Sequence, residues 1–246
     1  MAIHLIMPMA GEGSRFVKDG FDVPKPLLEI QGEPFFYWAT QSVRKFVELA
    51  SLTFVVLERH VKAYRMDEAI RAKFPEARLV VLPKVLNGAV LSALAGVAAV
   101  SDDAPILLND CDHIFTCQAF YAFCQKGAFG MPDGALLTFD SIDPKFSFAQ
   151  LDAEGNVVGT VEKQAVSRHA ICGAYYFRNR SLFETASEEY LHACAYKEYF
   201  VSGVYNVLAA HQQKIRAWHV DMHLPFGTPE EYEAARVSRA FEVLRG

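Results

Sequence analysis

The chain has 246 residues and a formal net charge of −5, with 52% hydrophobic and 22% charged residues. This composition excludes an intrinsically disordered chain and argues against a dedicated nucleic-acid-binding protein, which would carry an excess of basic residues. The most apolar stretch, 89–100, is shorter than the roughly 20 residues that span a bilayer, and the first residues lack a secretory signal pattern. We therefore expect a cytoplasmic protein that binds neither a membrane nor a nucleic acid.

The first half of the chain alternates apolar stretches with helical patterns. Strands are predicted over 3–8, 52–58, 77–82 and 104–110, and helices over 33–46, 60–74 and 88–100. Continuously apolar strands that alternate with helices indicate a parallel sheet covered on both faces. The five cysteines form no C-x-x-C pair, so we expect reduced thiols that pack as small apolar residues.

The second half is richer in strands. They are predicted over 134–140, 146–152, 156–163, 171–177 and 214–220, with a helix after 177 and a closing helix from Thr228. We predict a Rossmann-like three-layer α/β/α fold with a mostly parallel mixed sheet. It should form a single domain, 1–246, with a nucleotide-binding half at 1–115 and a substrate-binding half at 116–246.

A loop with two glycines, MPMAGEGSRF (7–16), follows the first predicted strand. Gly11 and Gly13 lack Cβ, so the backbone can take positive φ and turn successive N–H groups toward an anion. Arg15 adds a planar, permanently charged donor suited to phosphate oxygens. The loop is neither the dinucleotide-binding pattern, because Phe16 replaces its third glycine, nor a Walker loop. By itself it could simply turn the chain.

Lys25 strengthens the interpretation of the loop as a phosphate site. It stands between two prolines, which hold the backbone extended, ten residues after Arg15. A lysine on such a stiff segment could reach the same phosphates as Arg15. The alternative, a solvated loop lysine, is disfavoured by the apolar residues that follow it.

These segments resemble the signature of the nucleotidyltransferases that make nucleoside-diphosphate sugars. The signature residues are MAGEGSRF (9–16) and PKPLLEIQGEPFFYW (24–38). The resemblance continues, in the family's order, through NGAVLSAL (87–94), ILLNDCDHI (106–114), TVEK (160–163), ICGAYYF (171–177) and FGTPEEYEAA (226–235). The chain looks most like the branch of capsule and surface-polysaccharide pathways, whose members are dTDP-glucose pyrophosphorylase-like.

The resemblance implies transfer of a nucleoside monophosphate from a nucleoside triphosphate to a sugar 1-phosphate, with release of pyrophosphate and Mg²⁺ as cofactor. It assigns catalysis to Arg15, Lys25 and Asp112. The residues implied to bind the nucleotide are Met9, Ala10, Gly11, Gly13, Ser14, Arg15, Lys25, Asn87, Gly88 and Asp110. Those implied to bind the second substrate are Glu162, Lys163 and Gly173.

The metal ligands are only partly defined by the sequence. Asp110 and Asp112 follow a predicted strand and share a face if that strand is straight. Asp112 matches the family's metal-binding aspartate, and an oxygen-rich, phosphate-bridged site suits Mg²⁺. Many relatives carry a second aspartate where this chain has Pro225. Asp221 is therefore the candidate for the second ligand; otherwise Mg²⁺ would rely on Asp112 and the phosphates.

A further histidine-containing stretch, HVDMH (219–223), would place His219, Asp221 and His223 on one face of a continuous strand. Such a face could bind a transition metal. A partly exposed strand face is the simpler interpretation, since no fourth ligand is evident.

Three functions remain open at this point. The chain could act on a sugar 1-phosphate, or on a non-sugar phosphate such as a phosphorylated polyol, choline or amino-acid derivative. It could also be a regulatory nucleotide-binding protein without catalysis, which the missing second aspartate would favour. In the first two cases its partners are a nucleoside triphosphate and a phosphorylated small molecule. A homo-oligomer is compatible with the sequence, which defines neither the base nor the acceptor.

Overall fold

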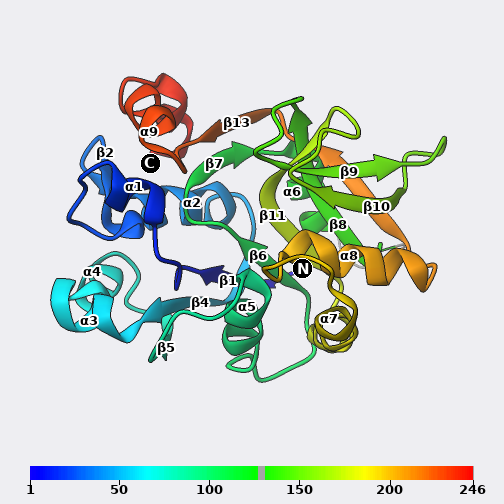
Figure 1. The fold of residues 1–246 in the computed structure, drawn as a ribbon, viewed down its shortest axis with the longest axis horizontal. Coiled ribbons are helices and arrows are strands. Elements are labelled where there is room, and N and C mark those ends of the chain that lie inside the picture. The colour runs from blue at the N-terminus through cyan, green and yellow to red at the C-terminus, as the bar shows by residue number, and fades with distance from the viewer. Residues whose placement is uncertain (127–130, 246) are drawn as a thin grey trace.

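The computed structural model describes residues 1–126 and 131–245. Within these residues a nine-stranded sheet forms the centre, in the order β10-β9-β11-β6-β1-β4-β5, and β8 and β12 extend it beside β11 (Figure 1). Its strands are β1 (Ile3–Pro8), β4 (Leu49–Leu57), β5 (Arg78–Leu82), β6 (Ile106–Asn109), β8 (Gly134–Asp140), β9 (Ser147–Leu151), β10 (Val157–Glu162), β11 (His169–Phe177) and β12 (Ile215–His219). Strands from both halves of the chain thus share one sheet.

The direction of the strands changes between the two halves. β1 pairs in parallel with β4 and β6, and β4 with β5. β11 runs antiparallel to β6, β8 and β9, whereas β12 is parallel to β8. The sheet is mixed, as predicted, because strands of the second half enter beside β6 in the opposite direction.

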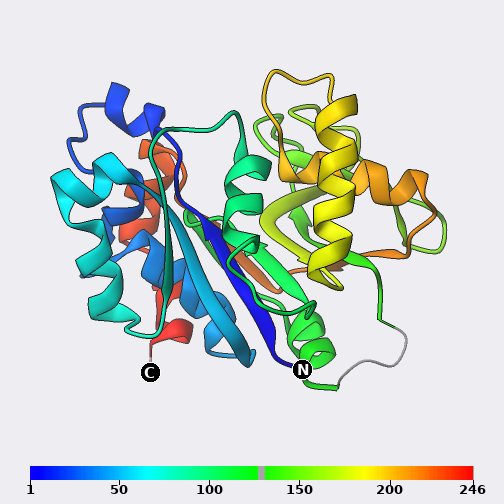
Figure 2. The same ribbon diagram turned by 90° about the horizontal axis from the view of Figure 1, so that it is seen from below.

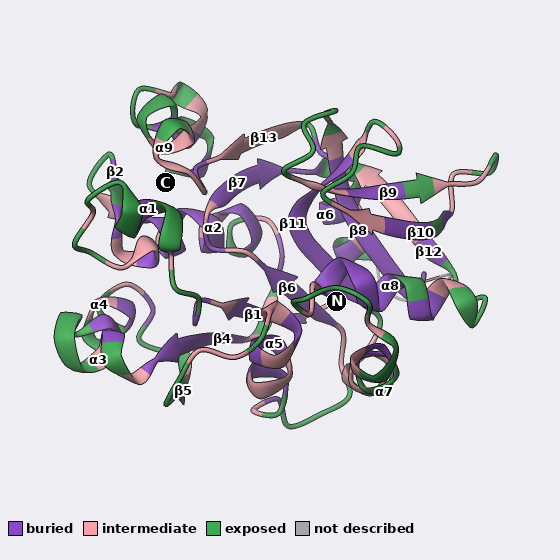
Figure 3. Cartoon of the chain, in the orientation of Figure 1, coloured by how far each residue is buried: buried purple, intermediate pink, exposed green. Residues whose placement is uncertain are grey.

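Helices cover both faces of the sheet, which confirms the three-layer α/β/α prediction (Figures 1 and 2). The helical segments are α1 (Ser14–Lys18), η1 (Lys25–Leu27), α2 (Phe35–Arg44), α3 (Glu58–Tyr64), α4 (Met66–Lys73), α5 (Ala89–Val97), α6 (Gln118–Lys126), α7 (Arg180–Ala193), α8 (Val201–Ala210), α9 (Pro229–Arg236) and η2 (Arg239–Leu244). Because side chains alternate along β1, Leu5 and Met7 pack with α2, α4 and α6, while Ile6 packs with α5. Figure 3 shows the buried sheet between these more exposed layers.

A smaller core lies beside the main one and joins the two ends of the chain. Phe16 of α1, Phe35 of α2 and Phe226 pack there with Phe241 and Leu244 of η2. Two short strand pairs flank this core, β2 (Glu29–Ile30) with β3 (Glu33–Pro34), and β7 (His113–Thr116) with β13 (Met222–Pro225). This packing brings the segment after β13 to the loop that follows β1.

The predicted helix over 60–74 is wrong as a single helix. Arg65 has φ 51° and separates α3 from α4. The break lets Met66 and Ile70 of α4 enter the core, where both side chains are fully buried.

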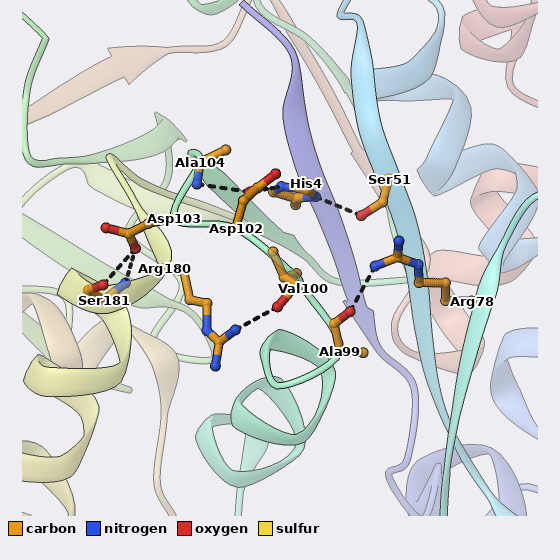
Figure 4. A network of polar contacts seen from close by, with 10 residues as sticks. All are labelled: His4, Ser51, Arg78, Ala99, Val100, Asp102, Asp103, Ala104, Arg180 and Ser181. Carbon is orange, nitrogen blue, oxygen red and sulfur yellow. Dashed lines mark hydrogen bonds and ion pairs between the residues drawn. The ribbon is translucent and has the colours of Figure 1, made fainter.

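Polar contacts fix the loop 98–105 at the end of the sheet opposite the carboxyl ends of the parallel strands (Figure 4). The ring of His4 lies between Ser51 Oγ at 2.7 Å and Asp102 Oδ1 at 2.8 Å. Arg180 Nη1 donates to the carbonyl of Val100, and Ser181 Oγ donates to Asp103. These contacts attach the loop to β1, β4 and α7 and fix its position at this end of the sheet.

In the part of the chain that the structure describes, no helix is both long and apolar enough to cross a membrane. The five thiols are unpaired with one another, and all but Cys194 are buried. This agrees with the expectation that they pack as small apolar residues.

Candidate functional site

Two neighbouring cavities lie at the carboxyl ends of the parallel strands, where ligands bind in open α/β sheets. We call the first the nucleotide cavity; it has a volume of about 500 Å³. It is lined by the loop after β1 and the start of α5, namely Pro8, Ala10, Gly11, Glu12, Gly13, Ser14, Val85, Leu86, Asn87, Gly88, Ala89 and Ser92, together with Glu198.

The loop after β1 bends sharply at one of its two glycines. Gly13 has φ 62° and starts α1, and its position faces Lys25, whose Cβ lies 3.3 Å from where a Gly13 Cβ would be. Gly11 does not adopt positive φ; it borders open space, with no atom within 4 Å of its Cβ position. Glu12 pairs with Arg59 of α3 at 2.8 Å, which ties the loop to the neighbouring helix.

On the opposite wall, Gly88 precedes α5 with φ 93°. A Cβ at this position would overlap the backbone of Tyr199, whose carbonyl accepts a hydrogen bond from Val90 N at 3.1 Å. Only glycine fits here, because the α7–α8 loop packs directly against the start of α5. The contact brings Glu198 to the edge of the nucleotide cavity.

Four of the residues predicted to bind the nucleotide do not line the nucleotide cavity: Met9, Arg15, Lys25 and Asp110. The side chain of Met9 is 2% exposed and packs in the core, and its amide donates to the carbonyl of Val55. Its N–H is therefore not available to a phosphate, and only its carbonyl oxygen remains for a ligand. Arg15 is exposed on the first turn of α1 and lines the second cavity rather than the first.

The second cavity, which we call the acceptor cavity, has a volume of about 250 Å³ and adjoins the first at Ala89. Its charged lining residues are Arg15, Asp110, Asp112, Lys145, Glu162, Lys163 and Glu231. Its aromatic and imidazole lining residues are His113, Phe146, Tyr175, Phe200 and His223. The cavity therefore combines cations suited to phosphates with carboxylates suited to a metal or to hydroxyl groups.

Lys25 and Asp112, 87 residues apart in sequence, form an ion pair in which Nζ lies 2.8 Å from Oδ2. The side chains are 25% and 23% exposed. Burial alone would lower the pKa of Lys25, but the carboxylates of Asp112 and Asp110 raise it well above its usual range. Burial would raise the pKa of Asp112, but Lys25 lowers it. Both groups are therefore charged at neutral pH.

Asp110 behaves differently from Asp112. Burial, and then the nearby charge of Asp112, raise its pKa, with a smaller opposing effect of Lys25. Gly173, which the resemblance implies binds the second substrate, lines the acceptor cavity and also lies against Asp110. Gly173 has φ 99°, and a Cβ there would lie 2.7 Å from Asp110 Oδ2. A Cβ on Gly227 would likewise overlap the Asp112 carboxylate, so two glycines make room for the two aspartates.

Glu162 is the last residue of β10, Lys163 follows it, and both line the acceptor cavity. Lys163 has φ 54°, which is rare for a long side chain, and its Nζ lies 4.8 Å from the centre of the Phe200 ring. Strained backbone of this kind often marks a functional site. Glu162 accepts hydrogen bonds from the hydroxyls of Ser147 and Ser202.

Asp221 is not beside Asp112, so the prediction of Asp221 as second metal ligand is wrong. Its carboxylate accepts a hydrogen bond from Gln118 N at 2.6 Å, at the start of α6. In the antiparallel pair of β7 and β13, Asp112 precedes one end and Asp221 the other. Asp221 stands opposite Cys117, five residues from Asp112, so the two aspartates are about 17 Å apart along the strands, at about 3.4 Å per residue.

The shared face predicted for His219, Asp221 and His223 is also wrong. β12 ends at His219 and β13 begins at Met222, so the chain turns between the histidines. The side chain of His219 is 58% exposed, with Nε2 3.8 Å from Asp140, whereas His223 lines the acceptor cavity. A strand pattern cannot be continued through a turn, and 219–223 contains one.

Lys145, His113 and Glu231 also line the acceptor cavity, although the sequence pattern did not single them out as site residues, and His223 was considered only as a transition-metal ligand. Lys145 pairs with Asp143 and with Glu231 of α9, at 3.1 and 2.8 Å. His113 and His223 lie with their ring centres 5.4 Å apart. Burial lowers the pKa of His113 to about 4 and that of His223 to about 3, so both rings are neutral at pH 7. Only Glu231 carried a signal, the T-x-x-E capping box with Thr228, which is present.

The donor set fits Mg²⁺ only in part. Among the described residues, no three His, Cys, Asp or Glu side chains are grouped so as to hold a metal ion. Asp110 and Asp112 nevertheless both line the acceptor cavity, each beside a glycine that leaves it room. Mg²⁺ is commonly held by one or two carboxylates together with substrate phosphates. The two aspartates fit that arrangement, whereas Asp221 does not.

Three solved structures illustrate the fold that this chain shares with known proteins. A nucleoside-diphosphate-sugar pyrophosphorylase from Vibrio cholerae RC9 is 21% identical, with a TM-score of 0.81, over 95% of this chain and 100% of that one. The inositol-1-phosphate CTP transferase from T. maritima is 17% identical, with a TM-score of 0.76, over 99% and 95%. A putative glucose-1-phosphate thymidylyltransferase from Bacillus anthracis is 16% identical, with a TM-score of 0.76, over 96% and 94%.

The family itself is shown by the sequence. A comparison with curated proteins gave no significant match. Residues 6–145, more than half of the chain, match the model of the MobA-like NTP transferase domain. The matched segment contains the glycine loop, Lys25, Asn87 and both aspartates of the site. The chain therefore belongs to the family of MobA-like NTP transferase domains and is a nucleotidyltransferase.

Proposed function

We propose that this nucleotidyltransferase transfers a nucleoside monophosphate from a nucleoside triphosphate to a sugar 1-phosphate and releases pyrophosphate. The proposed role is the synthesis of precursors for surface or capsular polysaccharide in the cytoplasm, in line with the branch that the signature segments resemble. The substrates would bind in the nucleotide and acceptor cavities, respectively.

The single observation that carries the proposal is the Lys25–Asp112 ion pair, in which Lys25 lies beside Gly13 of the nucleotide cavity and Asp112 lines the acceptor cavity. The glycine loop and the start of α5 line one cavity, and Glu162 and Lys163 line the other. A cation and a carboxylate that connect two such cavities in this way are suited to phosphoryl transfer, which depends mainly on positioning and charge neutralisation.

In the proposed reaction, an oxygen of the acceptor phosphate attacks the α-phosphorus of the triphosphate. A new P–O bond forms as the bond from the α-phosphorus to the bridging oxygen breaks, and pyrophosphate leaves with that oxygen. Lys25 stabilises charge on the α-phosphate, and Arg15 stabilises the leaving group. Lys163 holds the acceptor phosphate, while backbone N–H groups of the loop hold the triphosphate.

Mg²⁺ is the proposed cofactor, with Asp112 and Asp110 as its protein ligands. Asp110 would substitute for the second aspartate of many relatives, at whose position this chain has Pro225. When bound, the ion would neutralise phosphate charge during transfer. Lys25 would then exchange part of its contact with Asp112 for the α-phosphate. The pair keeps both groups charged before substrates bind.

A second acceptor class has specific support. The inositol-1-phosphate CTP transferase shares the fold over 99% of this chain, which is as extensive as the match to sugar-specific enzymes. A phosphorylated cyclitol offers the same hydroxyl donors to Glu162 as a sugar does. Polyol phosphates are therefore the alternative acceptors to be tested beside sugar 1-phosphates.

The proposal is tested by measuring pyrophosphate release from a matrix of substrates with Mg²⁺. The triphosphates are ATP, CTP, GTP, UTP and dTTP, and the acceptors include glucose 1-phosphate, mannose 1-phosphate, myo-inositol 1-phosphate and phosphocholine. We expect release with one triphosphate and a sugar 1-phosphate. Release only with inositol phosphate or phosphocholine would replace the proposed acceptor. Tight triphosphate binding without release in any pair would favour a regulatory protein.

A further inference from the structure

We propose that Ser147 and Ser202 are positioning residues that hold the Glu162 carboxylate ready for a hydroxyl group of the acceptor, and that Asn206 sets the register of this arrangement. The inference rests on the proposed function, because the acceptor is a polyhydroxylated phosphate. It concerns residues outside the segments that indicated the site from the sequence.

Hydrogen bonds attach α8 to the edge strand β10. Asn206 Oδ1 accepts a hydrogen bond from Thr160 N at 2.7 Å, and its Nδ2 donates to Thr160 O at 3.1 Å. The Thr160 hydroxyl in turn donates to the carbonyl of Ser202 at 2.8 Å. The Asn206 amide thus pairs with the edge strand as a neighbouring strand would, which fixes how far α8 can slide along β10.

The periodicities of the helix α8 and the strand β10 bring Ser202 to Glu162. Ser202 lies four residues before Asn206 and so on the same face of α8. Glu162 lies two residues after Thr160 and so on the same face of β10. Because Asn206 is hydrogen-bonded to Thr160, Ser202 lies beside Glu162. The Ser202 hydroxyl donates to Glu162 Oε1. The Ser202 side chain is 1% exposed, so it supports Glu162 from below the cavity.

A second hydroxyl, that of Ser147 on β9, donates to Glu162 from the neighbouring strand. Ser147 of β9 is the direct partner of Glu162 in the antiparallel β9–β10 pair, where side chains stand opposite each other. Its hydroxyl donates to the same atom, Glu162 Oε1, at 2.5 Å. Both serine hydroxyls therefore use one oxygen of the carboxylate, so that Oε2 is the oxygen left to accept from an acceptor hydroxyl.

The consequence is a carboxylate fixed before the acceptor arrives. Hydrogen bonds to an ionised carboxylate are stronger than those between neutral groups. A glutamate without them would lose rotational freedom on binding, which weakens affinity. Positioning of this kind should affect the binding of the acceptor and leave that of the triphosphate unchanged, because Glu162 lines the acceptor cavity alone.

The kinetic test uses Ser147→Ala, Ser202→Ala and Asn206→Ala, with the triphosphate and acceptor that react in the substrate matrix. We expect the KM for the acceptor to rise about five- to tenfold for either serine variant and about threefold for Asn206→Ala. The dissociation constant for the triphosphate should stay within about twofold of wild type. Ser147→Thr, which keeps the hydroxyl, should restore the acceptor KM.

The matched control is Ser167→Ala, which removes a serine hydroxyl bonded at 2.7 Å to the carbonyl of Ala149. Ser167 does not line the acceptor cavity, so its loss should not change the acceptor KM. An unchanged acceptor KM in both serine variants would overturn the inference. Equal losses of triphosphate and acceptor affinity would do so too, because they would indicate a general structural role.

A second measurement needs no acceptor and separates this inference from the proposed function. Crystal structures of the wild type and of Ser147→Ala/Ser202→Ala are compared. We expect one Glu162 conformer with both hydroxyl contacts in the wild type and a displaced side chain in the variant. The same Glu162 position in both proteins would overturn the inference. A substrate panel without turnover would contradict the proposed function alone.

Discussion

Lys25 Nζ lies 2.8 Å from Asp112 Oδ2, although 87 residues separate the two in sequence. Lys25 is the first residue of η1, a 3-10 turn, so the extended backbone predicted for it between the two prolines is wrong. Asp112 lies in the turn between β6 and β7, and both side chains are about three-quarters buried. The pair is the point where the segment after the glycine loop meets the carboxyl end of the sheet. Its two members differ in what their removal should do.

Lys25→Ala should lower turnover at least about 100-fold, which corresponds to about 2.7 kcal/mol of transition-state stabilisation. The reason is that Lys25 is assigned to the charge that develops on the α-phosphate. Lys18→Ala serves as the control, because Lys18 is an exposed lysine of the neighbouring α1. Steady-state rates of pyrophosphate release provide the measurement, and near-normal turnover of the Lys25 variant would refute the assigned role.

Asp112→Asn and Asp221→Asn should separate metal binding from helix capping. The first should abolish activation by Mg²⁺ while the far-ultraviolet circular dichroism stays unchanged. The second should keep Mg²⁺ activation and lower the free energy of unfolding by about 1 kcal/mol, because Asp221 caps α6. Mg²⁺ titrations and urea unfolding of both variants decide between the roles. Loss of Mg²⁺ activation in the Asp221 variant would contradict the assignment.

His113 should make stability depend on pH in the acidic range. Burial lowers its pKa to about 4 in the folded protein, whereas an unfolded histidine has a pKa of about 6.5. Below pH 6.5 the unfolded chain therefore binds a proton that the folded chain does not. The free energy of unfolding therefore decreases as the pH is lowered, by about 2 kcal/mol between pH 7 and pH 5, until the folded ring itself titrates near pH 4.

Urea unfolding of His113→Gln at pH 7 and pH 5 measures this contribution. The variant should lose about 2 kcal/mol less than the wild type over this interval. His192→Gln, at an exposed position of α7, should behave as the wild type does. Equal pH dependence in wild type and His113→Gln would show that His113 is not the group responsible.

Gly173→Ala and Gly155→Ala compare two glycines with positive φ. Gly155 has φ 79° and no atom within 4 Å of its Cβ position, so alanine there should cost only the backbone strain of about 1–2 kcal/mol. Gly173→Ala adds a clash with Asp110 and should be less stable than Gly155→Ala and also less active. Equal stability and activity of the two variants would exclude the Asp110 contact as the reason for Gly173.

The fold and the first part of the site followed from local patterns. The glycine loop, the lysine between prolines and the strand that ends at Asp110 are contiguous segments with distinct backbone requirements. The predicted helix over 33–46 and the strand over 134–140 correspond to α2 and β8. Where the chain breaks an element, as at Arg65 and between β12 and β13, the pattern failed because a single turn reverses which residues share a face.

Roles in catalysis and binding remain predictions for all the site residues. The structure adds which of them meet. The N–H of Met9 is bonded to the carbonyl of Val55, and Asp221 is excluded as a metal ligand because β7 and β13 separate it from Asp112. Lys145, His113, His223 and Ser147 line the acceptor cavity from elements that are distant in sequence, and Ser202 of α8 contacts Glu162 without lining the cavity.

The sequence by itself determined the layered α/β fold, the position of the glycine loop after β1 and the kind of chemistry, because each depends on residues close together along the chain. Only the tertiary structure decided which carboxylate faces Lys25, which groups hold Glu162, and that Gly173 and Gly227 make room for aspartates. Those relationships depend on strand register and on how helices pack over the sheet, and neither is encoded in a short segment.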